Sequence, residues 1–410
     1  MAMKTVNHGS GEALAFFGGP ATVQEPPPAW PIVDEGDRAA VLTVLESRVW
    51  GGYHPVVAEV ERRFADLHGA THGIATANGT VSLEIALTAS GIGAGDEVIV
   101  PPITFVASAT AILRVGAVPV FADVERDTLN LSPAAVERAL TPRTRAIVAV
   151  HFAGHPVDLD AFVDLCEQHR LTLIEDCAHA PGASWRGRPV GSFGAFGSFS
   201  FQASKNLTSG EGGMLISRTP ELAERAASLA NQGRRAGGAW YEHVNLGSNA
   251  RMTGFQAALI LRQLERLPAQ VALRAARAAR LRSGLAAVDG IDAVPAVLDD
   301  RVSAHAYHLF TMRVDGARWG SLGRERLAAA LQAEGVPVSL GYPYPIYRNP
   351  LFAREAHVVR DCPNAEEYCA NALWLPHNAV LADERWIESV LEAFLKVRRG
   401  AAALLAAESR

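Results

Sequence analysis

The hydrophobic pattern of the first half of the chain alternates between two kinds of segment. Short continuous apolar runs, typical of buried strands, are followed by stretches with apolar residues at helical spacing. In chain order the pattern predicts strand 118–123, helix 133–140, strand 146–151, helix 159–169 and strand 171–176. This strict alternation predicts a mostly parallel sheet with helices on both faces. No G-x-G-x-x-G motif opens the first unit, which argues against a dinucleotide-binding fold.

The same pattern divides the chain into three parts. Residues 1–33, with three consecutive prolines, predict an extended entry segment. Residues 34–270 form the predicted large domain, which begins with helices 34–47 and 56–68 and ends with helix 253–267. Residues 271–410 form a predicted smaller α+β domain with strand 308–314, helix 324–334 and strand 336–340. The basic, alanine-rich run 274–282 near the start of this smaller domain is interpreted as one solvated helix face.

Composition and charge exclude several classes of protein. Of the 410 residues, 49% are hydrophobic and 20% are charged, which is close to the average of globular proteins. The net charge is −5 without any concentration of Lys and Arg, so neither nucleic acid nor an anionic membrane is an expected partner. We find no secretory signal, no membrane-length apolar run, and four scattered cysteines without a disulfide or metal-ligand pattern. A cytoplasmic protein without a metal site is the expectation.

One lysine follows a strand and precedes a glycine-rich turn. The run Gly197–Gly213 alternates small and aromatic residues as a half-buried strand does, presents Lys205, and ends in Gly210-Glu211-Gly212-Gly213. A buried lysine has a lowered pKa and is a nucleophile towards an aldehyde, as in the Schiff-base lysines that anchor pyridoxal phosphate. On this segment alone, a solvated lysine at a strand end is the more common alternative.

A carboxylate in a second segment supplies what such a lysine requires. Asp176 ends the predicted strand 171–176, and the carboxyl ends of parallel strands line the crevice where α/β sheets bind ligands. A carboxylate there can keep a pyridine nitrogen protonated. An aspartate after a strand is more often a cap or turn residue. Its combination with Lys205 about thirty residues later is what makes the pair specific for a pyridoxal phosphate site.

These segments together resemble a known family. The motifs are Glu175-Asp176-Cys177-Ala178-His179-Ala180, Gly191-Ser192-Phe193-Gly194, Ser200-Phe201, Ser204-Lys205-Asn206-Leu207 and Gly210-Glu211-Gly212-Gly213. In this order they resemble the DegT/DnrJ/StrS family of pyridoxal-phosphate sugar and cyclitol aminotransferases, from about residue 30 to about residue 381. The resemblance implies a fold-type I transferase with pyridoxal 5'-phosphate as its cofactor.

The resemblance also implies roles for further residues. Gly79 and Thr80, at a predicted helix amino terminus where free N–H groups favour anions, would contact the cofactor phosphate together with Ser200. Phe105 would stack on the cofactor ring, and His179 would contact its hydroxyl region or support Asp176. For Ser200 a structural role on the strand is the alternative, and for Phe105 it is core packing.

Other implied contacts come from the partner subunit or from loops. Asn249 would reach the phosphate in a partner subunit, which implies a homodimer with composite active sites. The candidate substrate contacts are aromatic residues of two loops, for which plain packing is an equal alternative. They are Trp50, Tyr53, Tyr342 and Tyr344, with Tyr347 as a further candidate.

The resulting hypothesis is an aminotransferase of secondary-metabolite or amino-sugar biosynthesis. Lys205 would hold the cofactor and then act as base and acid, and Asp176 would keep the ring nitrogen protonated. The family's donors are L-glutamine or L-glutamate, and its acceptors are keto-sugar nucleotides or keto-cyclitols such as an inosose. The alternatives are an aminating dehydratase similar to 3-amino-5-hydroxybenzoate synthase and a sensor protein that keeps the fold without turnover. Lys205 argues against the family's dehydratases, which have histidine at its position.

Overall fold

The central feature of the fold is an eight-stranded sheet. A computed structural model describes residues 13–408, so residues 1–12 of the predicted entry segment lie outside the described part. The strand order is β1-β9-β8-β5-β4-β2-β3-β13. The strands are β1 His72–Thr76, β2 Glu97–Val100, β3 Val118–Phe121, β4 Thr144–Val150, β5 Thr172–Asp176, β8 Phe196–Ser200, β9 Gly213–Ser217 and β13 Val358–Val359. All pairs from β13 to β8 are parallel, and only β9 runs antiparallel to its neighbours, so the mostly parallel sheet is confirmed.

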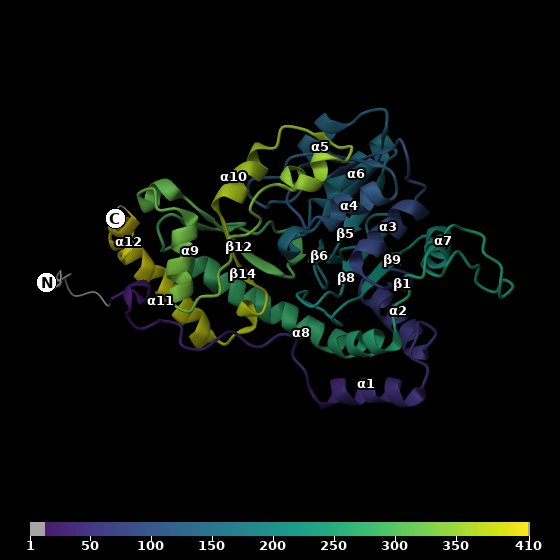
Figure 1. The fold of residues 1–410 in the computed structure, drawn as a ribbon, viewed down its shortest axis with the longest axis horizontal. Coiled ribbons are helices and arrows are strands. Elements are labelled where there is room, and N and C mark those ends of the chain that lie inside the picture. Colours follow the sequence, from purple (N-terminus) through teal and green to yellow (C-terminus); the bar gives the residue numbers. More distant parts are fainter. Residues whose placement is uncertain (1–12, 409–410) are drawn as a thin grey trace.

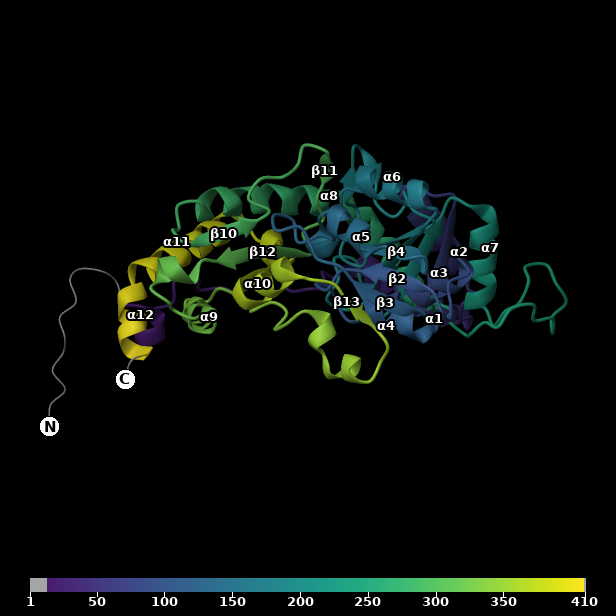
Figure 2. The same ribbon diagram turned by 90° about the horizontal axis from the view of Figure 1, so that it is seen from above.

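Helices cover both faces of this sheet, as predicted (Figures 1 and 2). Side chains of β4 alternate between two hydrophobic clusters: Ile147 and Ala149 face one, and Val148 and Val150 face the other. The first cluster receives α2 Pro55–Leu67, α5 Pro133–Ala139 and α6 Leu159–His169. The second receives α3 Gly79–Ala89, α4 Ala107–Arg114 and α7 Pro220–Ala230. Strand β8 lies inside the sheet and is buried except at Ser200, so the expectation of a half-buried strand was wrong.

A second lobe is built on a three-stranded antiparallel sheet. Its strands are β10 Ile291–Val294, β12 Leu309–Val314 and β14 Ala372–Pro376, in the order β10-β12-β14. Its helices are α9 Arg324–Ala333, α10 Pro363–Asn371, α11 Glu384–Arg399 and α12 Ala401–Glu408. Leu14 and Val23 of the entry segment belong to the core of this lobe. The predicted strand 336–340 is absent, and only an isolated bridge joins Ser339 to Trp374.

One long helix joins the two lobes (Figure 1). Helix α8, Gly254–Leu285, begins with a capping box of Thr253 and Gln256 and continues through Pro268. The predicted end at residue 267 was therefore wrong. An internal proline costs about 3 kcal/mol, but Leu264, Leu267 and Val271 on both sides of it are buried in the core of the large sheet. Packing thus outweighs the lost hydrogen bond.

The remaining elements are short or lie at the edges. Helix α1, Glu35–Ser47, begins at the predicted cap Asp34 and packs against α8. A small sheet has the order β11-β6-β7, with β11 Val302–Ala304, β6 Ser184–Trp185 and β7 Arg188–Pro189. The 3-10 helices are η1 Ala15–Phe17, η2 Phe152–Gly154, η3 Gly316–Trp319, η4 Ile346–Arg348, η5 Pro350–Ala353 and η6 Ala379–Leu381. The division into domains at residue 270 stays a prediction, since α8 runs through it and β13 joins the large sheet.

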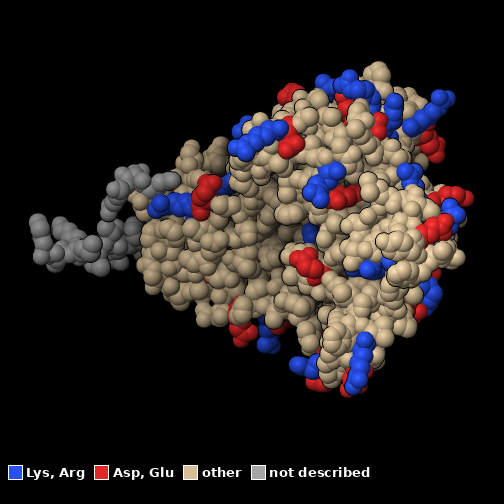
Figure 3. Space-filling model, turned by 45° about the vertical axis from the view of Figure 1, so that its right-hand side comes forward, with Lys and Arg blue, Asp and Glu red and all other residues tan. Residues whose placement is uncertain are grey.

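The surface and the cysteines add two observations. Lys and Arg residues are interspersed with Asp and Glu on the face that Figure 3 shows. The four cysteines are buried and free of disulfides. Within residues 13–408, none of the helices combines the length and the apolar character that crossing a membrane requires.

Candidate active site

A cavity of about 760 Å³ lies between the large sheet and the second lobe. The large-sheet side contributes residues at strand carboxyl ends and at a helix amino terminus, which is where α/β sheets bind ligands. Eight predicted site residues line this one cavity: Gly79, Thr80, Phe105, Asp176, His179, Ser200, Lys205 and Tyr342. The structure therefore brings together residues that are up to 263 positions apart in the chain, between Gly79 and Tyr342 (342 − 79 = 263).

Lys205 presents its amine to this cavity. It lies on the turn that follows β8, a neighbour of β5 in the sheet. Burial lowers the pKa of the Lys205 amine to about 8, against the opposing effect of the Asp176 carboxylate. An amine with that pKa is partly neutral near pH 7, and the neutral form is the nucleophile. This environment does not fit the alternative that Lys205 is a solvated lysine at the end of a strand.

Asp176 ends β5, the strand beside β8, and lines the same cavity. Its Oδ2 accepts a hydrogen bond from the Ser108 hydroxyl at 2.7 Å, and its Oδ1 accepts one from the Ala178 amide at 3.1 Å. The Thr104 and Ser108 hydroxyls are 2.9 Å apart and continue the chain of hydrogen bonds. Burial raises the pKa of the Asp176 carboxyl, whereas Ser108, Ala178 and Lys205 lower it. The carboxyl group is thus held rigidly in a site where a cationic N–H would stabilise its charge.

The amino terminus of α3 closes one end of the cavity. The Asn78 side chain caps the helix by accepting the Val81 amide at 2.9 Å, so the Gly79 and Thr80 amides remain in the first helical turn without an intrahelical acceptor. A Cβ on Gly79 would lie 2.7 Å from the Ser200 Cβ. Glycine therefore allows α3 and the end of β8 to approach, and together they form a cradle suited to an anion.

Two aromatic side chains flank the space between these groups. Phe105 is 59% exposed, although it is large and apolar, and it lines the cavity. His179 stacks on His308 with ring centroids 4.2 Å apart, and its buried Nδ1 has no partner among the described residues. Burial and Lys205 lower the pKa of His179 well below its usual value, so its ring is neutral. The cavity thus offers one flat apolar face and one unused ring nitrogen.

Four predicted site residues lie outside the cavity of the single chain. Asn249 is exposed and pairs with Asn231 in an isolated bridge, and the Tyr53 hydroxyl donates to the same Asn231 side chain at 3.1 Å. The Trp50 indole donates to the Leu45 carbonyl, and Tyr344 is 38% exposed. Contacts of these four to a substrate stay predictions.

Tyr347 also points away from the cavity. Its hydroxyl donates to Glu366 at 2.5 Å, and its ring packs against Phe121 in the core. For this residue the structure fits the packing alternative.

The sequence interpretation missed the wall that the second lobe contributes. That wall consists of His308, Leu309, Trp374, Pro376 and His377. It also missed Ser108, the partner of Asp176. None of these residues lies in a motif, and they reach the cavity because β12 and β14 begin or end beside it. Only a tertiary structure could reveal them.

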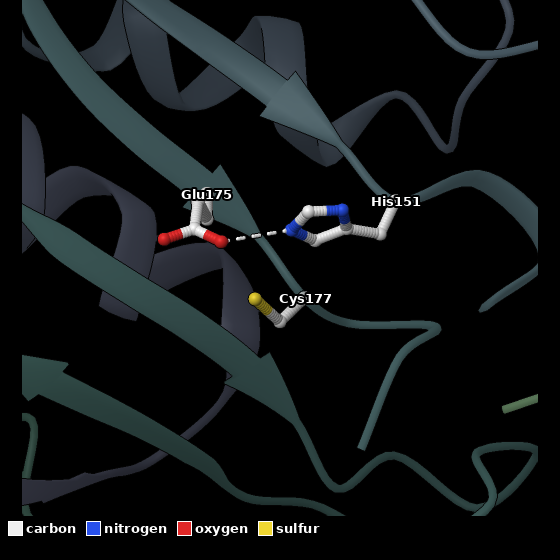
Figure 4. Close-up of side chains that lie close together, drawn as sticks. All are labelled: His151, Glu175 and Cys177. Carbon is white, nitrogen blue, oxygen red and sulfur yellow. Dashed lines mark hydrogen bonds and ion pairs between the residues drawn. The ribbon is translucent and has the colours of Figure 1, made fainter. Parts of the chain in front are cut away.

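Figure 4 shows a second buried cluster, made of His151, Glu175 and Cys177, none of which is in the lining of the cavity. His151, Glu175 and Cys177 have ligand atoms within 4.8 Å of one another, a spacing that a metal ion could bridge. Glu175, however, accepts four hydrogen bonds: from His151 Nε2 and from the amides of Gly191, Phe193 and Gly194. The other His151 nitrogen accepts the Val157 amide. Since both carboxylate oxygens and both ring nitrogens are occupied, the cluster serves as a structural clamp on the end of β5.

The fold and the cavity define a class of protein. A mostly parallel sheet with a lysine and a buried aspartate at the carboxyl ends of neighbouring strands is the arrangement of the fold-type I transferases. The chain belongs to the DegT/DnrJ/EryC1/StrS aminotransferase family, whose family model matches residues 31–395. It is thus an aminotransferase of this family, as predicted.

Individual relatives agree with this assignment. The chain is 41% identical to an L-glutamine:2-deoxy-scyllo-inosose aminotransferase of Micromonospora echinospora, over 94% of this chain and 97% of that protein. It is also 41% identical to an enzyme of the same name from Streptomyces lividus, over 96% and 100%. Among solved structures, 3-amino-5-hydroxybenzoic acid synthase is similar with a TM-score of 0.85 and 36% identity, covering 91% of this chain and 99% of that one.

Proposed function

We propose that this aminotransferase uses pyridoxal 5'-phosphate held at Lys205 to move an amino group from L-glutamine to a keto-cyclitol of the inosose type. The observation that carries the proposal is the pairing of Lys205 and Asp176 in one cavity with a helix amino terminus. The names of the two inosose aminotransferases support the donor and the acceptor class. L-Glutamate is the alternative donor.

The residues of the cavity fit this cofactor. The amides of Gly79 and Thr80 and the Ser200 hydroxyl would bind its phosphate, and Phe105 would lie against its ring. Asp176 would accept a hydrogen bond from the protonated ring nitrogen, and the unpartnered Nδ1 of His179 offers a partner for the ring hydroxyl. When bound, pyridoxal phosphate supplies an electron sink for the bond that breaks at the donor's α-carbon.

Lys205 has two tasks in this arrangement. Its amine, with a pKa of about 8, would hold the cofactor and would be released when the amino donor binds. The released Nζ would then be placed to take the proton from the donor's α-carbon as a base and to deliver it as an acid within the same half-reaction, with the reverse transfer in the second half-reaction. The second lobe excludes water from this side, where Leu309, Trp374 and Pro376 line the wall.

The charge of the cavity favours a neutral acceptor. Among the described residues that line it, Lys205 is the only Lys or Arg, and burial keeps His179, His308 and His377 neutral by lowering the pKa of each. The diphosphate of a nucleotide sugar would find no further Lys or Arg in the described lining of this cavity. Tyr342 and Trp374, edge to face with centroids 5.2 Å apart, offer a wall suited to a polyol ring.

A second candidate function is the aminating dehydratase. The likeness to 3-amino-5-hydroxybenzoic acid synthase favours it. The two inosose aminotransferases, however, are 41% identical to this chain, against 36% for that synthase. The keto-cyclitol is therefore the preferred acceptor.

We further propose that the protein is a homodimer. The segment after α7 projects from the body of the molecule (Figures 1 and 2), and Trp240, Tyr241 and Leu246 on it are 79%, 77% and 99% exposed. Apolar side chains this exposed are typical of an interface. The exposed Asn249 on the same segment supports the prediction that it completes the partner's phosphate site. Light scattering should give the mass of a dimer for the protein and of a monomer for Leu246→Asp, and a monomeric wild-type protein would contradict this.

One titration tests the catalytic proposal. The purified protein is loaded with pyridoxal phosphate, and its absorbance is followed while L-glutamine and then acceptors are added. We expect glutamine to discharge the bound chromophore and 2-deoxy-scyllo-inosose to restore it, with Lys205→Ala inactive in both steps. A keto-sugar nucleotide should not restore it. A protein that binds no chromophore, or one that neither amino donor discharges, would support the sensor alternative instead.

A further inference from the structure

The turn around the reactive lysine is contacted from outside the large sheet. The His377 ring faces the Ser204 backbone, which raises the pKa of the imidazole against a larger lowering by burial. The Trp30 indole N–H donates to the Lys205 carbonyl at 3.0 Å. The Asn206 amide donates to the Ala306 carbonyl at 2.7 Å. The turn that carries Lys205 is therefore fixed by the second lobe and by the entry segment, although it follows a strand of the large sheet.

Trp30 stands at the end of a segment whose backbone is fixed along the second lobe. Four side chains of that lobe hold residues 15–28, which run along its lower edge in Figure 1. Glu334 accepts the amides of Ala15 and Thr22, and the Lys396 ammonium donates to the Pro20 carbonyl. The Trp386 indole and the Asn378 amide each donate at 2.9 Å, to the carbonyls of Glu25 and Pro28. The position of Trp30 is thus determined by contacts along the whole segment.

Arg274 on α8 completes the group around His377. It was expected on a solvated helix face, which is wrong, since its side chain is fully buried. Its Nη2 donates to His377 Nδ1 at 3.3 Å, and its guanidinium lies 5.6 Å from the centre of the Trp30 ring. Its Nε and Nη1 have no partner among the described residues, and no carboxylate pairs with it. A buried charged group whose hydrogen bonds are only partly made lowers the stability of the fold, which suggests that this arginine is kept for function.

The arginine determines which His377 nitrogen carries the proton. A guanidinium can only donate, so Nδ1 of His377 accepts and the proton sits on Nε2. That N–H is then the group that His377 can present to the Ser204 backbone. The Trp30 ring meets the His377 ring edge to face with centroids 4.5 Å apart, which fixes the plane of the imidazole. Trp30, Arg274 and His377, here called the lysine clamp, therefore act on the Ser204–Lys205 backbone as one unit.

We propose that Trp30, Arg274 and His377 are positioning residues for Lys205. They hold the backbone of residues 204 and 205 still while the amine changes its bonding partner, and bond formation at an amine requires placement within fractions of an ångström. The entry segment is then part of the active-site support. This inference rests on the proposed role of Lys205, and its test below does not require the cofactor.

The chain offers a matched pair of variants. Trp30→Phe and Trp386→Phe each remove one indole N–H bonded to a backbone carbonyl, at 3.0 Å and 2.9 Å, but only Trp30 reaches Lys205. Amide hydrogen exchange of residues 202–208 is measured in the cofactor-free protein. We expect about fivefold faster exchange there in Trp30→Phe, the factor that one neutral hydrogen bond contributes, and wild-type exchange in Trp386→Phe. Equal exchange in the two variants would overturn the proposal.

Arg274→Met separates positioning from stability. The substitution removes a buried, unpaired charge, so the melting temperature should not fall. Exchange of residues 202–208 should still rise, because the His377 proton is no longer directed at Ser204. In the loaded enzyme the pH midpoint of the cofactor's absorbance should shift as well. A lower melting temperature with unchanged exchange would show that Arg274 is merely structural. If the wild-type protein binds no cofactor, the proposed function fails. The exchange result still tests whether the lysine clamp holds the backbone of residues 204 and 205.

Discussion

Glu175→Gln probes a buried carboxylate that accepts four hydrogen bonds. Glu175 lies on β5 directly before Asp176, and its side chain is fully buried. Its Oε2 accepts from His151 Nε2 at 3.1 Å and from the Gly191 amide at 2.7 Å, and its Oε1 accepts from the amides of Phe193 and Gly194, both at 2.8 Å. This carboxylate fixes the loop before β8 to the end of β5. It therefore supports the loop that leads into β8, the strand that pairs with β5 and precedes Lys205.

The expected loss of stability follows from the hydrogen bonds. Glutamine replaces one oxygen with an NH₂ group, and whichever oxygen is replaced, two donors then face another donor. Each such loss removes a hydrogen bond to a charged group and leaves a buried N–H unsatisfied, which costs about 1.5–3 kcal/mol. The variant should therefore lose about 3–6 kcal/mol, a large part of the roughly 5–15 kcal/mol by which proteins are stable.

The assay is urea denaturation followed by far-UV circular dichroism. Glu167→Gln, the same substitution at an exposed position on α6, is the control and should change the free energy of unfolding by less than about 0.5 kcal/mol. A loss below about 1 kcal/mol for Glu175→Gln would refute the reasoning, because the four donors would then have found other acceptors. If His151, Glu175 and Cys177 have this structural role and bind no metal, chelators should leave the melting temperature of the wild-type protein unchanged. A fall on chelation would instead favour a metal held by His151, Glu175 and Cys177.

Two further predictions test single contacts. Burial raises the pKa of Glu61 from 4.5 to about 7 in the folded protein. As the pH rises through this range, the unfolded chain loses the proton first, so the stability of the wild-type protein falls from pH 4.5 to about pH 7. Glu61→Gln keeps an acceptor for the Ala75 amide and should gain about 2 kcal/mol over wild type between pH 4.5 and pH 8, measured by thermal melts across pH. Gly79→Ala places a Cβ 2.7 Å from the Ser200 Cβ and should raise the dissociation constant for pyridoxal phosphate about tenfold in a fluorescence titration. Gly93→Ala, where the nearest atom is 3.7 Å away, is the control, and equal affinities of the two variants would contradict the phosphate cradle.

Those parts of the site that depend on a strand end could be predicted from the sequence. Asp176 and Lys205 each follow an apolar run, and parallel strands bring their carboxyl ends to one edge. Gly79 and Thr80 open a helix after a strand, which gives the same edge an anion site. In these cases the local pattern predicts the tertiary position, because strands joined by covering helices run parallel and bring their carboxyl ends to one edge.

The rest depends on packing between distant segments. Pro268 is a correct local signal for a helix end, but contacts of α8 with both lobes overrule it. The spacing of Arg274 among alanines is typical of a solvated face, yet the second lobe covers it completely. The predicted strand 336–340 has apolar alternation but only a single bridge partner, Trp374. Sequence patterns report which face of an element is apolar, and they do not report what lies opposite a polar residue.

The site therefore has two kinds of parts with different origins. The large sheet supplies the groups that would meet the cofactor, and these groups follow motifs. The second lobe supplies Tyr342, His308 and His377, and with Trp30 it holds the turn of Lys205. Because the lysine's side chain lines the cavity between the lobes while its carbonyl is bonded to Trp30 of the entry segment, a shift between the lobes would move the amine relative to Asp176. The continuous helix α8 and the fixed entry segment both oppose such a shift. We therefore expect the position of the Lys205 amine to be as sensitive to substitutions in the contact between the two lobes as to substitutions in the cavity itself.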